Sequence, residues 1–362
     1  MFYSPMKEAI IITAQLGLVF YIVSMVYLVL VYYAKNLTKK PTSSVVMANT
    51  YYENHITIVF NDYIDEASLL EKVQQLNHQG YKNYSACFFI DSPIVELNNM
   101  KHIKIIRPNS KKLKPFRLLE EVKSYLNEDT QAILVIKTTS TLDNNFLWHM
   151  NQNLLEGKEV VQSQLLINGI NSITNNYQVI ARKFFNLIDR EAMKASGLSS
   201  AIWSHGFMMK SPIFEAINFK DLEGNDKALQ AKLISKSIKI HYEPRAKIFE
   251  TDLEEEELVK TRMEWVASYW FTVSLGFNLL LEGVKNPNLD KIIFGFNYLR
   301  PPVYLILMAS VILAILDIIF MPELILFMGV AILGTLISLF LILKPYKLIA
   351  LFGQKKLANS IS

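Results

Sequence analysis

Residues 56–78 read ITIVFNDYIDEASLLEKVQQLNH, and this stretch indicates the fold class of the main domain. Its first five residues are apolar or β-branched, a composition that predicts a buried strand. The following residues, 67–78, predict a helix, because one face collects apolar side chains at helical spacing: Leu69, Leu70, Val73 and Leu76. A strand followed directly by a helix is the repeating unit of α/β domains.

The same alternation continues along the chain. Short apolar runs at residues 85–90, 102–106 and 132–136 predict three more strands, and residues 118–126 have helical spacing. Alternating strands and helices predict a parallel sheet. Because ligands of such sheets bind at the carboxyl ends of the strands, the residues just after each strand are the first candidates for function.

Composition adds a membrane component to this domain. Of the 362 residues, 51% are hydrophobic and only 19% are charged, and the apolar residues concentrate in three runs. The runs cover Ala9–Ala34, Val303–Met321 and Leu324–Leu343, each long enough for a membrane-spanning helix. Cys87 is the single cysteine. The sequence therefore excludes a disordered chain, a disulfide scaffold and a purely soluble enzyme.

Basic residues predict the orientation of these spans. Lys35 follows the first run, Arg300 precedes the second and Lys344 follows the third, whereas Pro322 marks a short turn between the last two. The positive-inside rule then predicts a multi-pass protein of the inner (cytoplasmic) membrane with its main domain in the cytoplasm. Asp317, about one helical turn from Pro322, is expected to reach the membrane interface.

We therefore predict an organisation in six parts. It consists of a transmembrane helix (1–34), a cytoplasmic linker (35–53), an α/β domain (54–250), an acidic linker with an interfacial amphipathic helix (251–300), a two-helix transmembrane hairpin (301–345) and a cytoplasmic tail (346–362). The net charge of +4 reflects basic residues beside the apolar runs, so the expected partner is a lipid bilayer and not nucleic acid.

Several motifs follow this layout. The first strand leads to Tyr63, the second ends in Asp91-Ser92, and residues 140–147 read STLDNNFL. Asn225-Asp226 precedes a helical pattern, and Trp265 closes the stretch TRMEW. In this order the segments resemble the family 2 glycosyltransferases, the GT-A fold group that includes cellulose synthase. The resemblance covers residues 54 to about 345 and implies a GT-A, Rossmann-like domain.

The resemblance also implies roles for particular residues. Those that match nucleotide-binding positions are Tyr63, Asp91, Lys137, Arg262 and Trp265. Asp226 matches the aspartate that acts as general base in the family. Each has a simpler explanation: Asp91 could cap a turn, and Asp226 could be an ordinary acid in the first turn of a helix. His205 has no second histidine or cysteine at metal-binding spacing and is expected to be a polar loop residue.

The chain departs from the family at the metal site. The family's Asp-x-Asp falls on Lys137-Thr138-Thr139, and no acid occurs between Ala132 and Leu142. A divalent cation needs hard anionic oxygens, which this segment lacks. Two further family positions are changed, because Asn225 and Glu264 stand where the family has glutamate and arginine. We therefore expect no metal ligands in this segment and no cofactor.

Three hypotheses follow. The first is a catalytically inactive pseudo-glycosyltransferase that acts as scaffold or regulatory subunit of a membrane complex, with a nucleotide sugar, lipid or glycan as ligand. The second is a divergent active glycosyltransferase in cell-surface glycan synthesis, with Mg or Mn and a nucleotide sugar as cofactor and donor. In it Asp226 is the base and Lys137 or Arg262 holds the diphosphate. The third is an adaptor that binds only protein.

Overall fold

The computed structural model describes residues 5–38, 52–90, 102–108, 113–167, 173–222, 225–250, 271–301 and 303–343. Contacts divide the chain into two compact units. The sheet unit contains residues 44–182 and 198–298, and the helical unit contains residues 1–43, 183–197 and 299–362.

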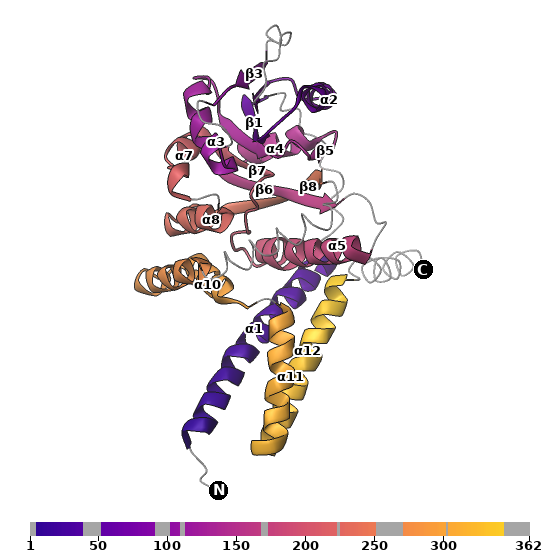
Figure 1. Ribbon diagram of the computed structural model, residues 1–362, viewed down its shortest axis with the longest axis vertical. Coiled ribbons are helices and arrows are strands. Elements are labelled where there is room, and N and C mark those ends of the chain that lie inside the picture. The colour runs from indigo at the N-terminus through magenta and orange to yellow at the C-terminus, as the bar shows by residue number, and fades with distance from the viewer. Residues whose placement is uncertain are drawn as a thin grey trace. The chain divides into compact units, whose positions relative to one another are not determined.

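The sheet unit is built on eight strands among the described residues (Figure 1). They are β1 (Ile56–Tyr63), β2 (Tyr84–Phe89), β3 (Ile103–Ile106), β4 (Ala132–Ile136), β5 (Thr141–Leu142), β6 (Val160–Ile167), β7 (Phe207–Lys210) and β8 (Ile240–Glu250). Their order in the sheet is β3-β2-β1-β4-β7-β6-β8-β5. The strands predicted from the four apolar runs are confirmed as β1 to β4, with small shifts at their ends.

The sheet is mixed, which corrects the prediction of a parallel sheet. Strand β7 lies between β4 and β6 and is antiparallel to both, and β5 is antiparallel to β8. All other pairs are parallel. The carboxyl ends of β1, β4, β6 and β8 therefore share one edge of the sheet with the amino end of β7, and we call it the carboxyl edge.

Helices cover the sheet and bury its apolar side chains. Helices α2 (Glu66–Asn77) and α4 (Phe146–Leu155) contribute to one hydrophobic core together with alternate residues of β1. Helix α3 (Pro115–Val122) contacts β1, and α7 (Ser211–Glu215) contacts β4 and β7. In α2 the predicted apolar face is partly wrong, because Leu70 is 45% exposed, whereas Lys72 is buried and its ammonium group donates a hydrogen bond of 3.0 Å to the carbonyl oxygen of Ser140.

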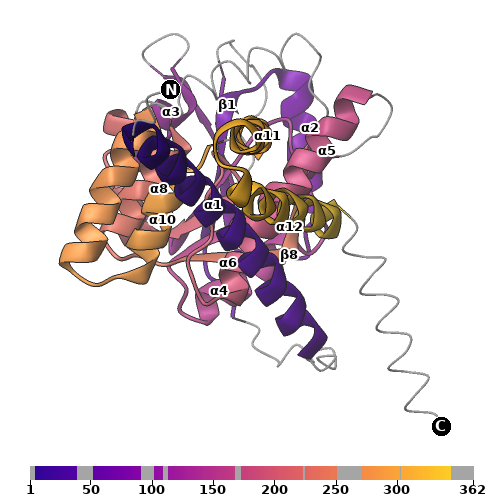
Figure 2. The same cartoon turned by 90° about the horizontal axis from the view of Figure 1, so that it is seen from below.

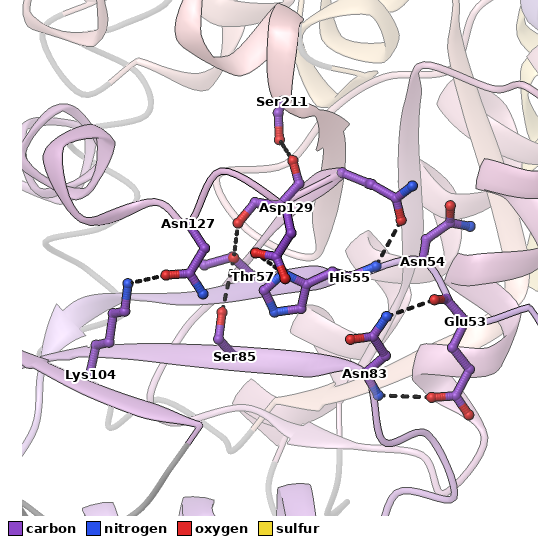
Figure 3. Close-up of polar contacts among 12 residues, drawn as sticks. Glu53, Asn54, His55, Thr57, Asn83, Ser85, Lys104, Asn127, Asp129 and Ser211 are labelled. Atoms are coloured by element: carbon purple, nitrogen blue, oxygen red, sulfur yellow. Dashed lines mark hydrogen bonds and ion pairs between the residues drawn. The ribbon is translucent and has the colours of Figure 1, made fainter.

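At the opposite edge of the sheet, where β1, β2 and β4 begin, polar side chains contact one another (Figure 3). We call it the amino edge. The Thr57 hydroxyl lies 3.0 Å from that of Ser85 and 2.9 Å from that of Thr130. His55 Nδ1 lies 3.1 Å from Asp129 Oδ1. The three buried hydroxyls are hydrogen-bonded to one another, and these contacts link the beginnings of β1 and β2 to the residues before β4.

The rest of the sheet unit is helical. It comprises α5 (Ile173–Asn186), of which residues 173–182 belong to this unit, α8 (Asp226–Ser235), a helix through residues 271–285, and α10 (Leu289–Leu299). The last two helices pack closely at Gly295, where an added Cβ would lie 2.5 Å from Leu280 Cγ. Exposed apolar residues line the helix of residues 271–285: Phe271, Phe277, Leu281 and Val284.

Three apolar helices dominate the helical unit, and they contact one another (Figure 2). They are α1 (Pro5–Thr38), α11 (Val303–Phe320) and α12 (Ile325–Leu343). Among the described residues, two helical segments are long and apolar enough to cross a membrane, Glu8–Leu37 and Pro322–Ile342, whereas the apolar part of α11, Leu305–Phe320, is shorter. A π-helical turn, Leu187–Ala192, also contacts α1.

The environment of Asp317 differs from the prediction. Its side chain is fully buried and accepts a hydrogen bond of 2.6 Å from Gln15 Nε2 of α1. Asp317 therefore faces the neighbouring helix, and the expectation that it reaches the interface is wrong. Sequence alone could not show this, because the two residues are 302 positions apart.

Candidate functional site

The candidate site lies at the carboxyl edge of the sheet. Asp62 belongs to the end of β1, Lys137 follows β4 directly, and Glu250 ends β8. His205 comes two residues before β7, whose amino end lies at the same edge. Because β1 and β4 are parallel neighbours, with Phe60 opposite Ile136, the topology brings the residues that follow them together.

Asp62 and Lys137 are the first pair of this cluster. The carboxylate of Asp62 accepts a hydrogen bond from the Thr138 N–H and is attracted by the ammonium of Lys137, which is half-buried. Burial raises the pKa of Asp62, and the charge of Lys137, the nearby His205 and the Thr138 N–H offset part of that rise.

His205, Glu250 and Arg182 form the second part. His205 Nε2 lies 2.9 Å from Glu250 Oε1, and the other carboxylate oxygen of Glu250 accepts a hydrogen bond from the Arg182 guanidinium. Arg182, on α5, also lies over the ring of Trp203 at 4.3 Å from its centroid. Five segments distant in sequence are thus connected through one buried network: the ends of β1, β4 and β8, the loop before β7, and α5.

The pKa values show how strongly the network is coupled. Burial opposes ionisation of Glu250, but its contacts with His205 and Arg182 and the charge of Lys137 outweigh burial and lower its pKa to about 2. Burial also lowers the pKa of His205, despite the opposing effect of Glu250. Lys137 and Arg182 thus face Asp62 and Glu250, and the ionised cluster has no net charge.

This donor set does not fit a divalent cation. Glu250 is engaged by Arg182 and His205, and Asp62 by Thr138 and Lys137. A metal ion between the two carboxylates would displace these partners and lie beside an ammonium group, which repels it. Within the described ranges, no three His, Cys, Asp or Glu residues are arranged to hold a metal.

The structure places some of the predicted site residues. Tyr63 ends β1, and its hydroxyl accepts a hydrogen bond of 3.1 Å from the Leu113 N–H. Asp226 is the first residue of α8, directly after the helix cap Asn225, and its charge contributes to raising the pKa of the buried Tyr298. Its role as a base stays a prediction. Other predicted residues lie outside the described ranges: Asp91, Arg262, Glu264 and Trp265.

Three members of the cluster were not predicted from the sequence. The resemblance assigns no role to Asp62, Arg182 or Glu250. His205 lies in the loop before β7, as expected, but it is 2% exposed and forms part of the network. Asp62 and Glu250 were detectable in principle, since both lie at the ends of strands. Arg182 gave no sequence signal, because its partner is 68 residues away.

The fold is similar to that of a solved glycosyltransferase. Among solved structures, the chain is similar to mannosyltransferase PcManGT from Pyrobaculum calidifontis in complex with GDP-Man and Mn2+. The TM-score is 0.50 at 12% sequence identity, and the match covers 91% of this chain and 99% of that one. At this identity the likeness shows the fold alone.

Other comparisons gave weaker matches or none. The structure of S. aureus TarS matches with a TM-score of 0.41 at 11% identity, over 63% of this chain and 40% of that one. Its fragment 1–349 matches with a TM-score of 0.40 at 11% identity, over 82% and 91% of the two chains. No protein-family model and no curated protein matches this sequence.

Proposed function

We propose that this protein is a membrane-anchored pseudo-glycosyltransferase of the family 2 type, which acts as scaffold or regulatory subunit of a membrane complex. One observation carries the proposal. At the edge where a GT-A domain would hold the metal and diphosphate of its donor, Lys137 stands in place of the expected carboxylates and faces Asp62 and Glu250. The resident charges neutralise one another, so metal-dependent sugar transfer has no ligand set in this cluster.

The membrane part of the proposal rests on the apolar helices. α1 and α12 meet the length needed to span a bilayer, and α11, with 18 residues, is about 27 Å long. We propose that α11 is a third span, since only the short turn at Pro322 connects it to α12. The basic flanks at Lys35 and Arg300 then favour a cytoplasmic sheet unit.

Chain connectivity supports an interfacial role for the helix of residues 271–285. Three residues separate Leu299, the end of α10, from Val303, the start of α11, so the two ends lie within about 15 Å of each other. The exposed apolar stripe, which includes Phe277 and Leu281, is suited to the inner leaflet. We therefore propose the bilayer and other membrane subunits as partners, with no metal cofactor.

Binding of nucleoside diphosphates and nucleotide sugars to the detergent-purified full chain, measured by calorimetry with and without Mn2+, tests the proposal. We expect no metal-dependent binding and no turnover. The control is the double variant Lys137→Asp/Thr139→Asp, which restores two carboxylates after β4 and is expected to gain Mn2+ affinity. Micromolar, Mn2+-dependent binding with sugar transfer by the native chain would establish the active alternative instead.

A further inference from the structure

A buried polar pair joins α1 and α11. Gln15 is 2% exposed and Asp317 is fully buried, and they are joined by the 2.6 Å hydrogen bond from Gln15 Nε2 to Asp317 Oδ1. The second carboxyl oxygen of Asp317 is buried and has no hydrogen-bond partner among the described residues. The surfaces of these two helices are otherwise dominated by aliphatic and aromatic side chains.

Burying polar groups in such surroundings costs free energy, and we therefore ask what the buried pair contributes to the fold. Apolar helix contacts alone specify poorly which faces pair and at what axial offset, because lipid and side chains are similarly apolar. A single buried polar pair can specify both, since every other alignment leaves two polar groups unpaired. Among the described residues of α1, Gln15 is the buried polar residue that hydrogen-bonds to Asp317.

A second polar contact ties the other end of α1. The Tyr33 hydroxyl donates a hydrogen bond of 2.7 Å to the carbonyl oxygen of Leu341 in α12. Between the two contacts, Ile22 of α1 packs in one cluster with Ile306 of α11 and Ala331 of α12. α1 is therefore bound to one helix of the C-terminal hairpin near its beginning and to the other helix near its end.

We propose that Gln15 and Asp317 form a polar clasp that selects the face and axial register with which α1 pairs with α11. The clasp determines how the N-terminal helix joins the C-terminal hairpin. It goes beyond the proposed function and does not depend on whether the sheet unit transfers sugar. Removing one partner leaves the other buried and unpaired, whereas removing both leaves an apolar contact.

The test is an unfolding titration with sodium dodecyl sulfate on the full chain in mixed micelles. Gln15→Leu is expected to lower the folded-to-unfolded ratio about 3- to 20-fold. The double variant Gln15→Leu/Asp317→Leu is expected to recover most of this loss. The matched control is Thr13→Val, because Thr13 is exposed and its hydroxyl donates a hydrogen bond to the Ala9 carbonyl oxygen within its own helix. Equal effects of Gln15→Leu and Thr13→Val, or a double variant as unstable as the single one, would overturn the clasp.

Disulfide cross-linking measures the register of α1 against α11 directly, and it can be used even if Gln15→Leu does not fold. Ile22 and Ile306, which belong to one cluster, are both replaced by cysteine in the full chain, and the yield of the disulfide between them is measured after oxidation. The parent protein, which contains only the buried Cys87, gives the background yield. Asp317→Asn keeps a hydrogen-bonding partner for Gln15 and is expected to preserve the cross-link. Asp317→Leu is expected to reduce it several-fold. Unchanged cross-linking in Asp317→Leu would contradict a role in register.

Discussion

Replacing Glu250 by glutamine tests whether the buried network at the carboxyl edge holds the sheet unit together. The native carboxylate has a pKa of about 2, against 4.5 for an ordinary glutamate. A difference of about 2.5 units corresponds to about 3 kcal/mol of stability at neutral pH. The Glu250 side chain is only 14% exposed, so solvent screening reduces this figure little. Glu250→Gln also leaves the buried guanidinium of Arg182 without its anionic partner, which pushes the cost towards the upper part of the usual range of about 3–5 kcal/mol for breaking a buried ion pair.

Thermal unfolding of the full chain, followed by tryptophan fluorescence, measures the effect. A loss of about 3–5 kcal/mol is expected to lower the midpoint by about 6–20 °C for a unit of this size. The control is Glu156→Gln, because Glu156 is 57% exposed in its ion pair with Lys158 and should contribute little.

The pH dependence has a definite sign. The folded-state pKa of Glu250 is depressed, so its contribution is present above pH 4.5 and is lost as the pH falls towards 2. The difference in stability between native protein and Glu250→Gln should therefore shrink over that window. If Glu250→Gln is as stable as Glu156→Gln, or if the difference does not change with pH, the Glu250 carboxylate does not stabilise the sheet unit.

Three further predictions concern the two edges of the sheet. Gly206→Ala should destabilise the sheet unit by about 2–4 kcal/mol, because Gly206 has φ +71° and an added Cβ would meet Ser163 Oγ at 2.7 Å. Gly157→Ala, with φ +81° but open space, should cost only about 1 kcal/mol in the same denaturant titration; equal losses would contradict the steric argument. Thr57→Val should cost about 1–3 kcal/mol in unfolding, because it leaves two buried hydroxyls at the amino edge without their shared partner. The imidazole NMR signal that disappears in His205→Gln should titrate with a midpoint below 6.5, since burial lowers the pKa of His205; a midpoint above that value would show that Glu250 dominates.

Local sequence patterns were enough to predict the α/β class and several of its elements. Strands β1 to β4 and helix α2 were predictable because apolar side chains recur with the period of each element, and this periodicity is a local property. The apolar runs likewise predicted α1, α11 and α12, since a helix crossing hydrocarbon needs a long uncharged stretch. The replacement of the expected carboxylates by Lys137 was also visible, because it depends on the order of residues alone.

The contacts that those residues make depend on the folded chain. The antiparallel insertion of β7 has no local signal, since strand direction depends on how the chain returns to the sheet. Asp62 and Glu250 lie near Lys137 because the ends of β1, β4 and β8 are at the same edge of the sheet. The partners of Glu250 and Asp317, Arg182 and Gln15, are 68 and 302 residues away. Periodicity reports which side of an element is buried, but the partner of a buried charge depends on long-range packing, which only the folded chain contains.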